Sequence, residues 1–169
     1  MSNNMPVINV ADIVINPTNS NEIYVATGDN FGWGVSQTFY GYSMGVLKST
    51  DGGNTWNPTG LSWNLPQGTT MRRLIMDTSN PTTLIAATSL GIYKTTDGGA
   101  SWSLNKAGSI IDIDYHPINK NIVYAVNDSI FKSTDGGTSW NHVAGSPVFN
   151  NPTNYKYWRG SVAVTPDAP

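Results

Sequence analysis

Cysteine is absent from the sequence, which excludes a disulfide scaffold and any metal site built on thiolates. Charge is also scarce, because nine Lys and Arg residues stand against eleven Asp and Glu residues, with a formal net charge of −2. Nucleic-acid binding needs clustered cations, whereas Lys48, Lys94 and Lys132 recur singly at one place in a repeated motif. We therefore expect no nucleic-acid partner.

Long apolar segments are missing as well. No stretch approaches the length of a membrane span, so we expect no membrane partner. The first ten residues, MSNNMPVINV, lack the basic region and the apolar run of a signal peptide. If the natural protein is exported, we expect its signal to lie outside this sequence.

Three copies of one pattern run through the chain. Each copy opens with an apolar run, a Pro- or Asn-rich turn and a second apolar run: IVINPTNSNEIYVAT (13–27), LIMDTSNPTTLIAAT (74–88) and IDYHPINKNIVYAVN (113–127). Each then continues into one of three matching segments: GVLKSTDGGNTW (45–56), GIYKTTDGGASW (91–102) and SIFKSTDGGTSW (129–140). A fourth copy begins in SVAVTPDAP (161–169). Such repetition indicates a fold assembled from similar units.

Each copy is predicted to form four short strands. β-branched and aromatic residues occur in short alternating runs, with Asn, Pro, Asp and Gly between them. No window of helical length has a period of 3.6 residues. A four-stranded unit of about 40 residues has the size of a β-propeller blade.

The sequence therefore predicts an all-β fold, a partial β-propeller with three four-stranded blades and the first strand of a fourth. One domain spans 1–169, divided into blade 1 near 10–60, blade 2 near 71–106, blade 3 near 110–145 and the start of blade 4 near 159–169. Propellers typically close with roughly 4–8 blades. Open ends expose sheet faces and strand edges. We therefore expect as partners the remaining blades of a longer chain or further copies of this chain.

The segment KSTDGGNTW (48–56) gathers a carboxylate, hydroxyls and glycines, as a metal or phosphate site does. Between two strands, however, Asp-Gly-Gly is predicted to be a turn, because Asp accepts bonds from nearby N–H groups and Gly adopts positive φ. A cation needs several oxygen ligands, and each motif supplies one carboxylate. We expect no metal and no cofactor, and tryptophans packed between sheets. The predicted structural residues are Asp51, Gly52, Trp56, Asp97, Gly98, Trp102, Asp135, Gly136 and Trp140.

The pattern S/T-x-D-G-G-x-S/T-W resembles the Asp-box repeat, also called the BNR repeat. That repeat occurs in sialidases, xyloglucanase-type glycoside hydrolases, sortilin-type receptors and secreted bacterial propellers. The order of residues in GVLKSTDGGNTWNPTGL most resembles that in propellers of exported Bacteroidetes proteins. The resemblance covers almost the whole chain and implies a propeller that is extracellular or on the cell surface. It implies little about activity, because these proteins range from hydrolases to binding modules. In the family, the Asp-box lies away from the ligand face.

Strand direction places the DGG turns and the long insertions at opposite ends of the blades. The insertions are 28–44, 58–72 and 144–159, and function often lies in long loops on a rigid scaffold. Ten of the eighteen aromatic residues fall in them, among them Phe31 and Phe149. The predicted ligand-binding residues are Trp33, Phe39, Tyr40, Tyr42, Trp63, Tyr155, Tyr157, Trp158 and Arg159. For any one ring, packing of the loop itself is an equal alternative; Trp33 and Tyr157 are the strongest candidates for exposure.

A glycosidase needs two carboxylates that face each other across the substrate. Glu22, the single glutamate, is predicted in a turn at the Asp-box end, whereas Asp29 is predicted at the loop end. Asp12 and Asp112 begin matching first strands, which makes them the one sensible acid and base pair. The alternative is that each caps its strand start or solvates the channel.

Other catalytic classes find less support. Arg72, Arg73 and Arg159 are the only arginines, too few for a sialidase-type arginine cluster. The sequence contains no GxSxG, P-loop or HExxH motif, and His116 and His142 are predicted to be surface residues.

Three functions are therefore compared. The leading one is a non-catalytic binding or scaffold propeller of an exported bacterial protein, with its ligand, a glycan or a protein, on the aromatic loops. The second is a fragment of a glycoside hydrolase, xyloglucanase-like or sialidase-like, that acts on polysaccharide. The third is a purely structural repeat.

Overall fold

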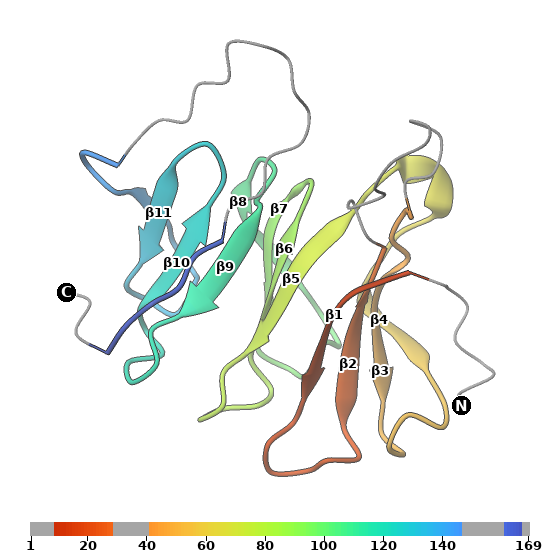
Figure 1. Cartoon of the computed structure of the whole chain (residues 1–169). Coiled ribbons are helices and arrows are strands. Elements are labelled where there is room, and N and C mark those ends of the chain that lie inside the picture. Colours follow the sequence, from red (N-terminus) through yellow and green to blue (C-terminus); the bar gives the residue numbers. More distant parts are fainter. Residues whose placement is uncertain (1–8, 29–40, 147–160, 167–169) are drawn as a thin grey trace.

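The computed structural model describes residues 9–28, 41–146 and 161–166, which form three antiparallel sheets of four strands each (Figure 1). No α-helix forms among these residues, and the predicted all-β fold is confirmed. Blade 1 contains β1 (Val10–Ile15), β2 (Ile23–Thr27), β3 (Gly45–Ser49) and β4 (Asn57–Ser62), followed by the short 3-10 turn η1 (Leu65–Gln67). Blade 2 contains β5 (Met71–Met76), β6 (Leu84–Thr88), β7 (Gly91–Thr95) and β8 (Ser103–Ala107). Blade 3 contains β9 (Asp112–Tyr115), β10 (Val123–Val126), β11 (Ile130–Ser133) and β12 (Asn141–His142).

Within each blade, strands that are consecutive in sequence are neighbours in the sheet. The three blades stand side by side, with their first strands β1, β5 and β9 toward the viewer in Figure 1. The turns that join β1 to β2, β5 to β6 and β9 to β10 lie at the lower end, and η1 lies at the upper end. Residues 161–166 pass beside β9 and are not paired into a fourth sheet. This row of blades is a partial propeller.

The second strand of each blade is largely buried. All five residues of β6 are buried, and this strand is paired on both sides, with β5 and with β7. The fourth strands are more polar and more exposed, and β4 even contains Pro58. Proline lacks an N–H donor and is tolerated on such an edge strand.

Each blade has two faces, which we name by the neighbour they meet: the upstream face looks toward the preceding blade and the downstream face toward the following one. The first core cluster joins the downstream face of blade 1, with Tyr24, Ala26 and Val46, to the upstream face of blade 2. The residues on the blade 2 side are Leu74, Met76, Leu84 and Ala86. The second cluster joins blades 2 and 3 in the same way. Burial of apolar surface between blades thus holds the row together.

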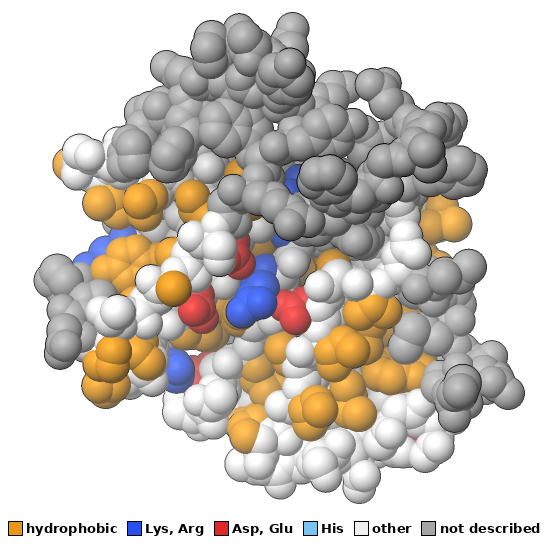
Figure 2. Space-filling view, in the orientation of Figure 1, with side chains coloured by type: hydrophobic (Ala, Val, Ile, Leu, Met, Phe, Trp, Pro, Cys, Tyr) orange, Lys and Arg blue, Asp and Glu red, His pale blue; other side chains and the backbone are white. Residues whose placement is uncertain are grey.

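The upstream face of blade 1 has no described blade against it. Ile13 and Ile15 are each 54% exposed there, whereas Leu74 and Met76, at the equivalent positions of blade 2, are 1% and 8% exposed. Figure 2 shows hydrophobic side chains gathered over the lower part of blade 1. The alternation of apolar residues is the same in both blades, so only the neighbour differs.

Candidate functional site

The three DGG turns share one pattern of hydrogen bonds. In blade 2, Oδ1 of Asp97 accepts from Thr95 Oγ1 at 2.7 Å and from Ser101 N at 2.9 Å, while Oδ2 accepts from Ser101 Oγ at 2.6 Å. Asp51 and Asp135 have the equivalent partners in blades 1 and 3. The glycine that follows each aspartate has a φ in the left-handed region, 72° at Gly52, 68° at Gly98 and 68° at Gly136. Each carboxylate is therefore occupied within its own turn.

These hydrogen bonds favour the ionised carboxylates. They lower the pKa of Asp51 to about 2, chiefly through the Thr55 hydroxyl and the Thr55 backbone N–H. Hydrogen bonds from Ser101 and from Ser139 likewise hold the pKa values of Asp97 and Asp135 well below the ordinary value for aspartate. A carboxylate that stays ionised and saturated with local donors is suited to fix a turn.

The tryptophan that closes each turn donates its indole N–H to the carbonyl of the second glycine, over 3.1 to 3.2 Å. Trp102 packs against the core between blades 1 and 2, and Trp140 packs against the core between blades 2 and 3. Trp56 has the same local hydrogen bond but lines an open pocket instead. The three tryptophans thus share a turn and differ in their neighbours.

The first strands bring Asp12 and Asp112 to either side of Arg73. The Arg73 Nε atom lies 3.6 Å from Asp12 Oδ2 and 3.8 Å from Asp112 Oδ1. Figure 2 shows basic side chains next to acidic ones in the middle of this face. Arg73 stands in blade 2 at the repeat position that holds Asp12 in blade 1 and Asp112 in blade 3, so one arginine separates the predicted acid and base pair.

Both aspartates also bind the chain of the following repeat. Asp12 accepts from the N–H of its own neighbour Ile13 at 2.9 Å and from Leu74 N in blade 2 at 3.0 Å. Asp112 repeats the arrangement with Ile113 N and with Val162 N, each at 2.9 Å. These bonds tie a strand start to the opening segment of the next repeat, which is the strand β5 for Asp12 and residues 161–166 for Asp112; the sequence alone did not predict this contact.

A polar cluster bridges blades 1 and 2 near the Asp-box of blade 2. Tyr24 Oη donates to Glu22 Oε1 at 2.6 Å and lies 3.0 Å from the Gly98 carbonyl. Lys48 Nζ lies 3.1 Å from Glu22 Oε1 and 3.3 Å from the same carbonyl. Partial burial opposes ionisation of Glu22, but the hydrogen bonds from Tyr24 and Lys48 prevail and lower its pKa. Glu22 is thus a structural partner between blades.

The lysine of this cluster recurs in the next blade pair. Lys94 Nζ donates to Thr138 Oγ1, in the Asp-box turn of blade 3, at 2.9 Å. The sequence does contain a signal for this contact. A lysine stands at the same position of every repeat, which indicates that its side chain has a similar structural role in each blade. That this lysine reaches the turn of the next blade is not evident from the sequence alone.

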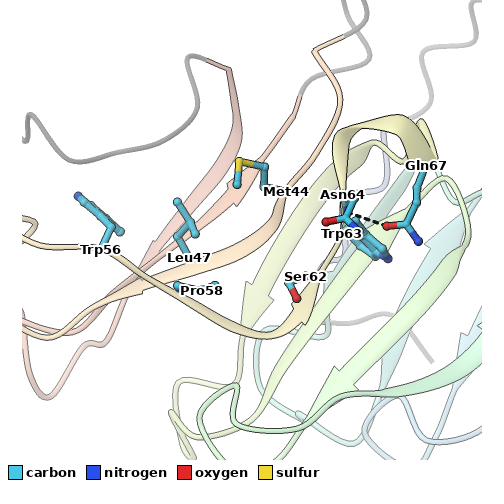
Figure 3. A pocket seen from close by; sticks show the side chains of 8 residues that line it. All are labelled: Met44, Leu47, Trp56, Pro58, Ser62, Trp63, Asn64 and Gln67. Atoms are coloured by element: carbon cyan, nitrogen blue, oxygen red, sulfur yellow. Dashed lines mark hydrogen bonds between the residues drawn. The ribbon is translucent and has the colours of Figure 1, made fainter.

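A pocket of about 510 Å³ lies beside β3 and β4 (Figure 3). Two tryptophans mark its ends in the figure, Trp56 and Trp63, with Leu47 and Met44 between them. The remaining lining residues are Pro58, Ser62, Asn64 and Gln67, and Asn64 N donates to Gln67 Oε1 at 2.7 Å. Aromatic faces next to amides suit stacking and hydrogen bonding of a sugar or a peptide.

Two of the predicted ligand-binding residues fall in the described part of the chain. Tyr42 is 41% exposed, and Trp63 is half-buried with its ring edge-on to Tyr93 at 5.9 Å between centroids. Trp63 therefore both packs between blades and lines the pocket. The other predicted residues lie outside the described residues: Trp33, Phe39, Tyr40, Tyr155, Tyr157, Trp158 and Arg159.

The two histidines have different positions. The surface prediction for His116 is wrong: it is 5% exposed, and its Nδ1 accepts from Ile118 N and Asn119 N in the turn after β9. A buried imidazole here supplies the acceptor that Asn or Asp supplies in the turns of the other blades. His142 is exposed and lies edge-on to Phe131.

Within the described residues, no three His, Cys, Asp or Glu side chains are grouped as a metal site requires. The same part of the chain contains no helix with the length and apolar character needed to cross a membrane.

No protein-family model matches the chain, and no curated protein matches it significantly. Solved structures do. An ancestral GH74 enzyme is 24% identical with a TM-score of 0.62, over 85% of this chain and 19% of that one. The GH74 xyloglucanase from Xanthomonas campestris is 18% identical with a TM-score of 0.61, over 84% and 24% of the two chains. A structure of YCF48 bound to D1 peptide is 18% identical with a TM-score of 0.57, over 82% and 42%.

These similarities show the fold. The neighbours are β-propellers, and the chain spans about a fifth to two fifths of their lengths.

Proposed function

We propose that the chain is a non-catalytic binding or scaffold part of an Asp-box (BNR) β-propeller from an exported bacterial protein, located outside the cell or on its surface. The observation that carries this proposal is that the carboxylates of Asp12 and Asp112, the predicted acid and base pair, already have protein partners. Asp12 and Asp112 are paired to Arg73, and each accepts a backbone N–H of the following repeat. A general acid must exchange a proton with substrate, whereas these groups hold strands in place.

The binding face in this proposal is the end of the blades that carries the long loops. Tyr42 and Trp63 are its described members, and Trp63 lines a pocket with amide and aromatic groups. Sugars stack on such rings, and peptides bind them through apolar contacts and hydrogen bonds. The comparison with YCF48 bound to D1 peptide makes peptides a second ligand class to test beside glycans.

The test is a screen of glycan and peptide arrays, followed by titration of any ligand found. Trp33→Ala, Trp63→Ala and Tyr157→Ala should each weaken binding at least tenfold, about 1.4 kcal/mol, if the loop aromatics bind the ligand. Ile118→Ala is the matched control, since Ile118 is 74% exposed in a turn at the opposite end. If all three aromatic variants bind the ligand as tightly as the unchanged chain does, the proposed binding face is rejected.

The alternative is a fragment of a glycoside hydrolase, xyloglucanase-like or sialidase-like, that acts on polysaccharide, and the GH74 neighbours favour it. In that case Asp12 and Asp112 would be the acid and base pair. Release of reducing ends from a polysaccharide panel would then vanish in Asp12→Asn or Asp112→Asn, each first shown to be folded. If the unchanged chain releases reducing ends and both variants do not, the proposal of a glycoside hydrolase replaces the proposal of a binding propeller.

A further inference from the structure

The upstream face of blade 1 has the residues of a blade interface. Ile13 and Ile15 occupy the positions that hold Leu74 and Met76 in blade 2, where the preceding blade buries them. Exposed side chains of this size are costly when they form a contiguous strip. Val25 and Leu47 on the same face are buried, so the exposed part of this face, within the described residues, is the β1 strip and the pocket beside Trp56.

Among the described residues, the turn of blade 1 also lacks the polar contacts that blade 2 receives. A Cβ placed on Gly98 would lie 3.3 Å from Tyr24 Oη and 3.4 Å from Lys48 Nζ, both in the preceding blade. At Gly52, the only neighbour within 4 Å among the described residues is Asn21 of the same blade. The contact between blades 1 and 2 thus shows which groups cover the upstream face at the DGG turn: a tyrosine on the second strand and a lysine on the third strand of the preceding blade.

Blade 3 presents that pair on its downstream face. Tyr124 and Lys132 stand at the repeat positions of Tyr24 and Lys48. Lys48 Nζ lies over the Tyr24 ring at 4.9 Å, and Lys132 Nζ lies over the Tyr124 ring at 5.4 Å. Blade 2 has Ile85 in place of the tyrosine, so blade 3 matches blade 1 more closely than blade 2 does.

We propose that the upstream face of blade 1 docks the downstream face of blade 3 of a second copy of this chain, with Tyr124 and Lys132 directed to the Gly52 carbonyl. The contact is head-to-tail, because it joins two different faces. It rests on the partial-propeller part of the proposed function, and its contacts are the β1 strip and the Gly52 turn rather than the loop-end residues Tyr42 and Trp63.

Residues 161–166 compete for the same place. Asp112 holds Val162 N as Asp12 holds Leu74 N, so this segment lies where the first strand of a following blade begins. Its sequence Val-Ala-Val-Thr-Pro follows the pattern of Ile13 to Pro17, the end of β1 and the start of the turn after it. Docking of β1 from a second copy therefore displaces the segment, and Val164→Asp, which weakens its apolar packing, should tighten association.

The experiment is sedimentation equilibrium of the full chain over a wide concentration range, with two single variants and their mixture. We expect concentration-dependent association, weakened at least tenfold by Ile15→Lys on the upstream face and by Lys132→Glu on the downstream face. Each variant keeps one intact face, so their equimolar mixture should give a one-to-one pair. Circular dichroism should first show that both variants are folded. If Ile15→Lys does not fold, Ile13→Ser replaces it.

Ile118→Lys is the matched control, since Ile118 is exposed but lies in the turn after β9. A chain that is monomeric at every concentration overturns the proposal, as does full association of Lys132→Glu, which would indicate a symmetric contact between upstream faces. An effect of Ile118→Lys equal to that of Ile15→Lys would also overturn it, because it would indicate unspecific aggregation. The Ile15→Lys variant should still bind a ligand of the loop face, and the Trp33→Ala variant should still associate with a second copy. The docking proposal and the ligand-binding proposal can therefore fail independently.

Discussion

The upstream faces of blades 1 and 2 have the same sequence pattern and different surroundings. In blade 2 the positions of Leu74 and Met76 are covered by Tyr24, Ala26 and Val46 of blade 1. In blade 1 the equivalent Ile13 and Ile15 are more than half exposed. The difference teaches that the repeat encodes an interface on every blade, whether or not a described blade covers it.

The largest difference is expected from truncation of one equivalent pair, Leu74→Ala and Ile13→Ala. Leu74→Ala should lower the free energy of unfolding by about 3 kcal/mol, because it opens a cavity in a packed interface. Ile13→Ala should cost less than about 1 kcal/mol, because the side chain is already solvated. Urea unfolding followed by tryptophan fluorescence measures both. Equal costs would mean that the upstream face of blade 1 is covered in solution.

The next difference concerns the tryptophans of the turns. Trp102→Ala removes the ring that packs against the core between blades 1 and 2 and should cost about 3 kcal/mol. Trp56→Ala removes the same indole hydrogen bond but a ring that lines a pocket, and it should cost about 1 kcal/mol. Thermal unfolding under identical conditions compares them, and Trp102→Phe is the control that keeps an aromatic ring. A larger loss for Trp56→Ala would contradict the assignment of an open face.

The sequence was sufficient to predict the blades because the signal is repeated three times. Alternating apolar residues and the DGG turns set the strands, and the turns are local, since each aspartate bonds within four residues of itself. Asp51, Asp97 and Asp135 could therefore be interpreted from their own neighbours.

Contacts between blades were harder to predict because they depend on how sheets stack. Arg73 meets Asp12 and Asp112 only through the placement of three first strands. In sequence, Arg73 lies 61 residues after Asp12 and 39 residues before Asp112. Glu22 was placed in the correct turn, but its role with Tyr24 and Lys48 requires the neighbouring Gly98 carbonyl. The surface prediction for His116 is wrong because a single histidine in the sequence does not indicate its role as a hydrogen-bond acceptor in the turn.

A smaller effect is expected where the polar cluster bridges blades 1 and 2. Tyr24→Phe removes the hydroxyl that bonds Glu22 and faces the Gly98 carbonyl, and it should cost about 1 kcal/mol. Lys48→Met removes the second donor, and a double-mutant cycle should give a coupling of about 0.5 kcal/mol or more, since both groups share one carbonyl. Strictly additive losses would show that the two side chains act independently.

The smallest difference between the blades is expected at the Asp-boxes, because their hydrogen bonds are local and the same on open and covered faces. The folded pKa of Asp51 is about 2, below the ordinary aspartate value of 3.8, so its ionised form stabilises the folded state above that value. This contribution is lost as the pH falls through the folded pKa, and the melting temperature should drop between pH 4 and pH 2.

Asp51→Asn in blade 1 and Asp97→Asn in blade 2 test whether the boxes are equivalent. Each amide replaces one acceptor oxygen by a donor, so the bond from the Thr55 or Ser101 hydroxyl is lost while the turn keeps its shape. Both variants should lower the melting temperature at pH 7 by similar amounts and should lose less than the parent chain on acidification to pH 2. Because the hydrogen bonds of each carboxylate lie within its own turn, a clearly larger loss for Asp97→Asn would show that the neighbouring blade strengthens the turn through Gly98, and that the box is a part of the interface.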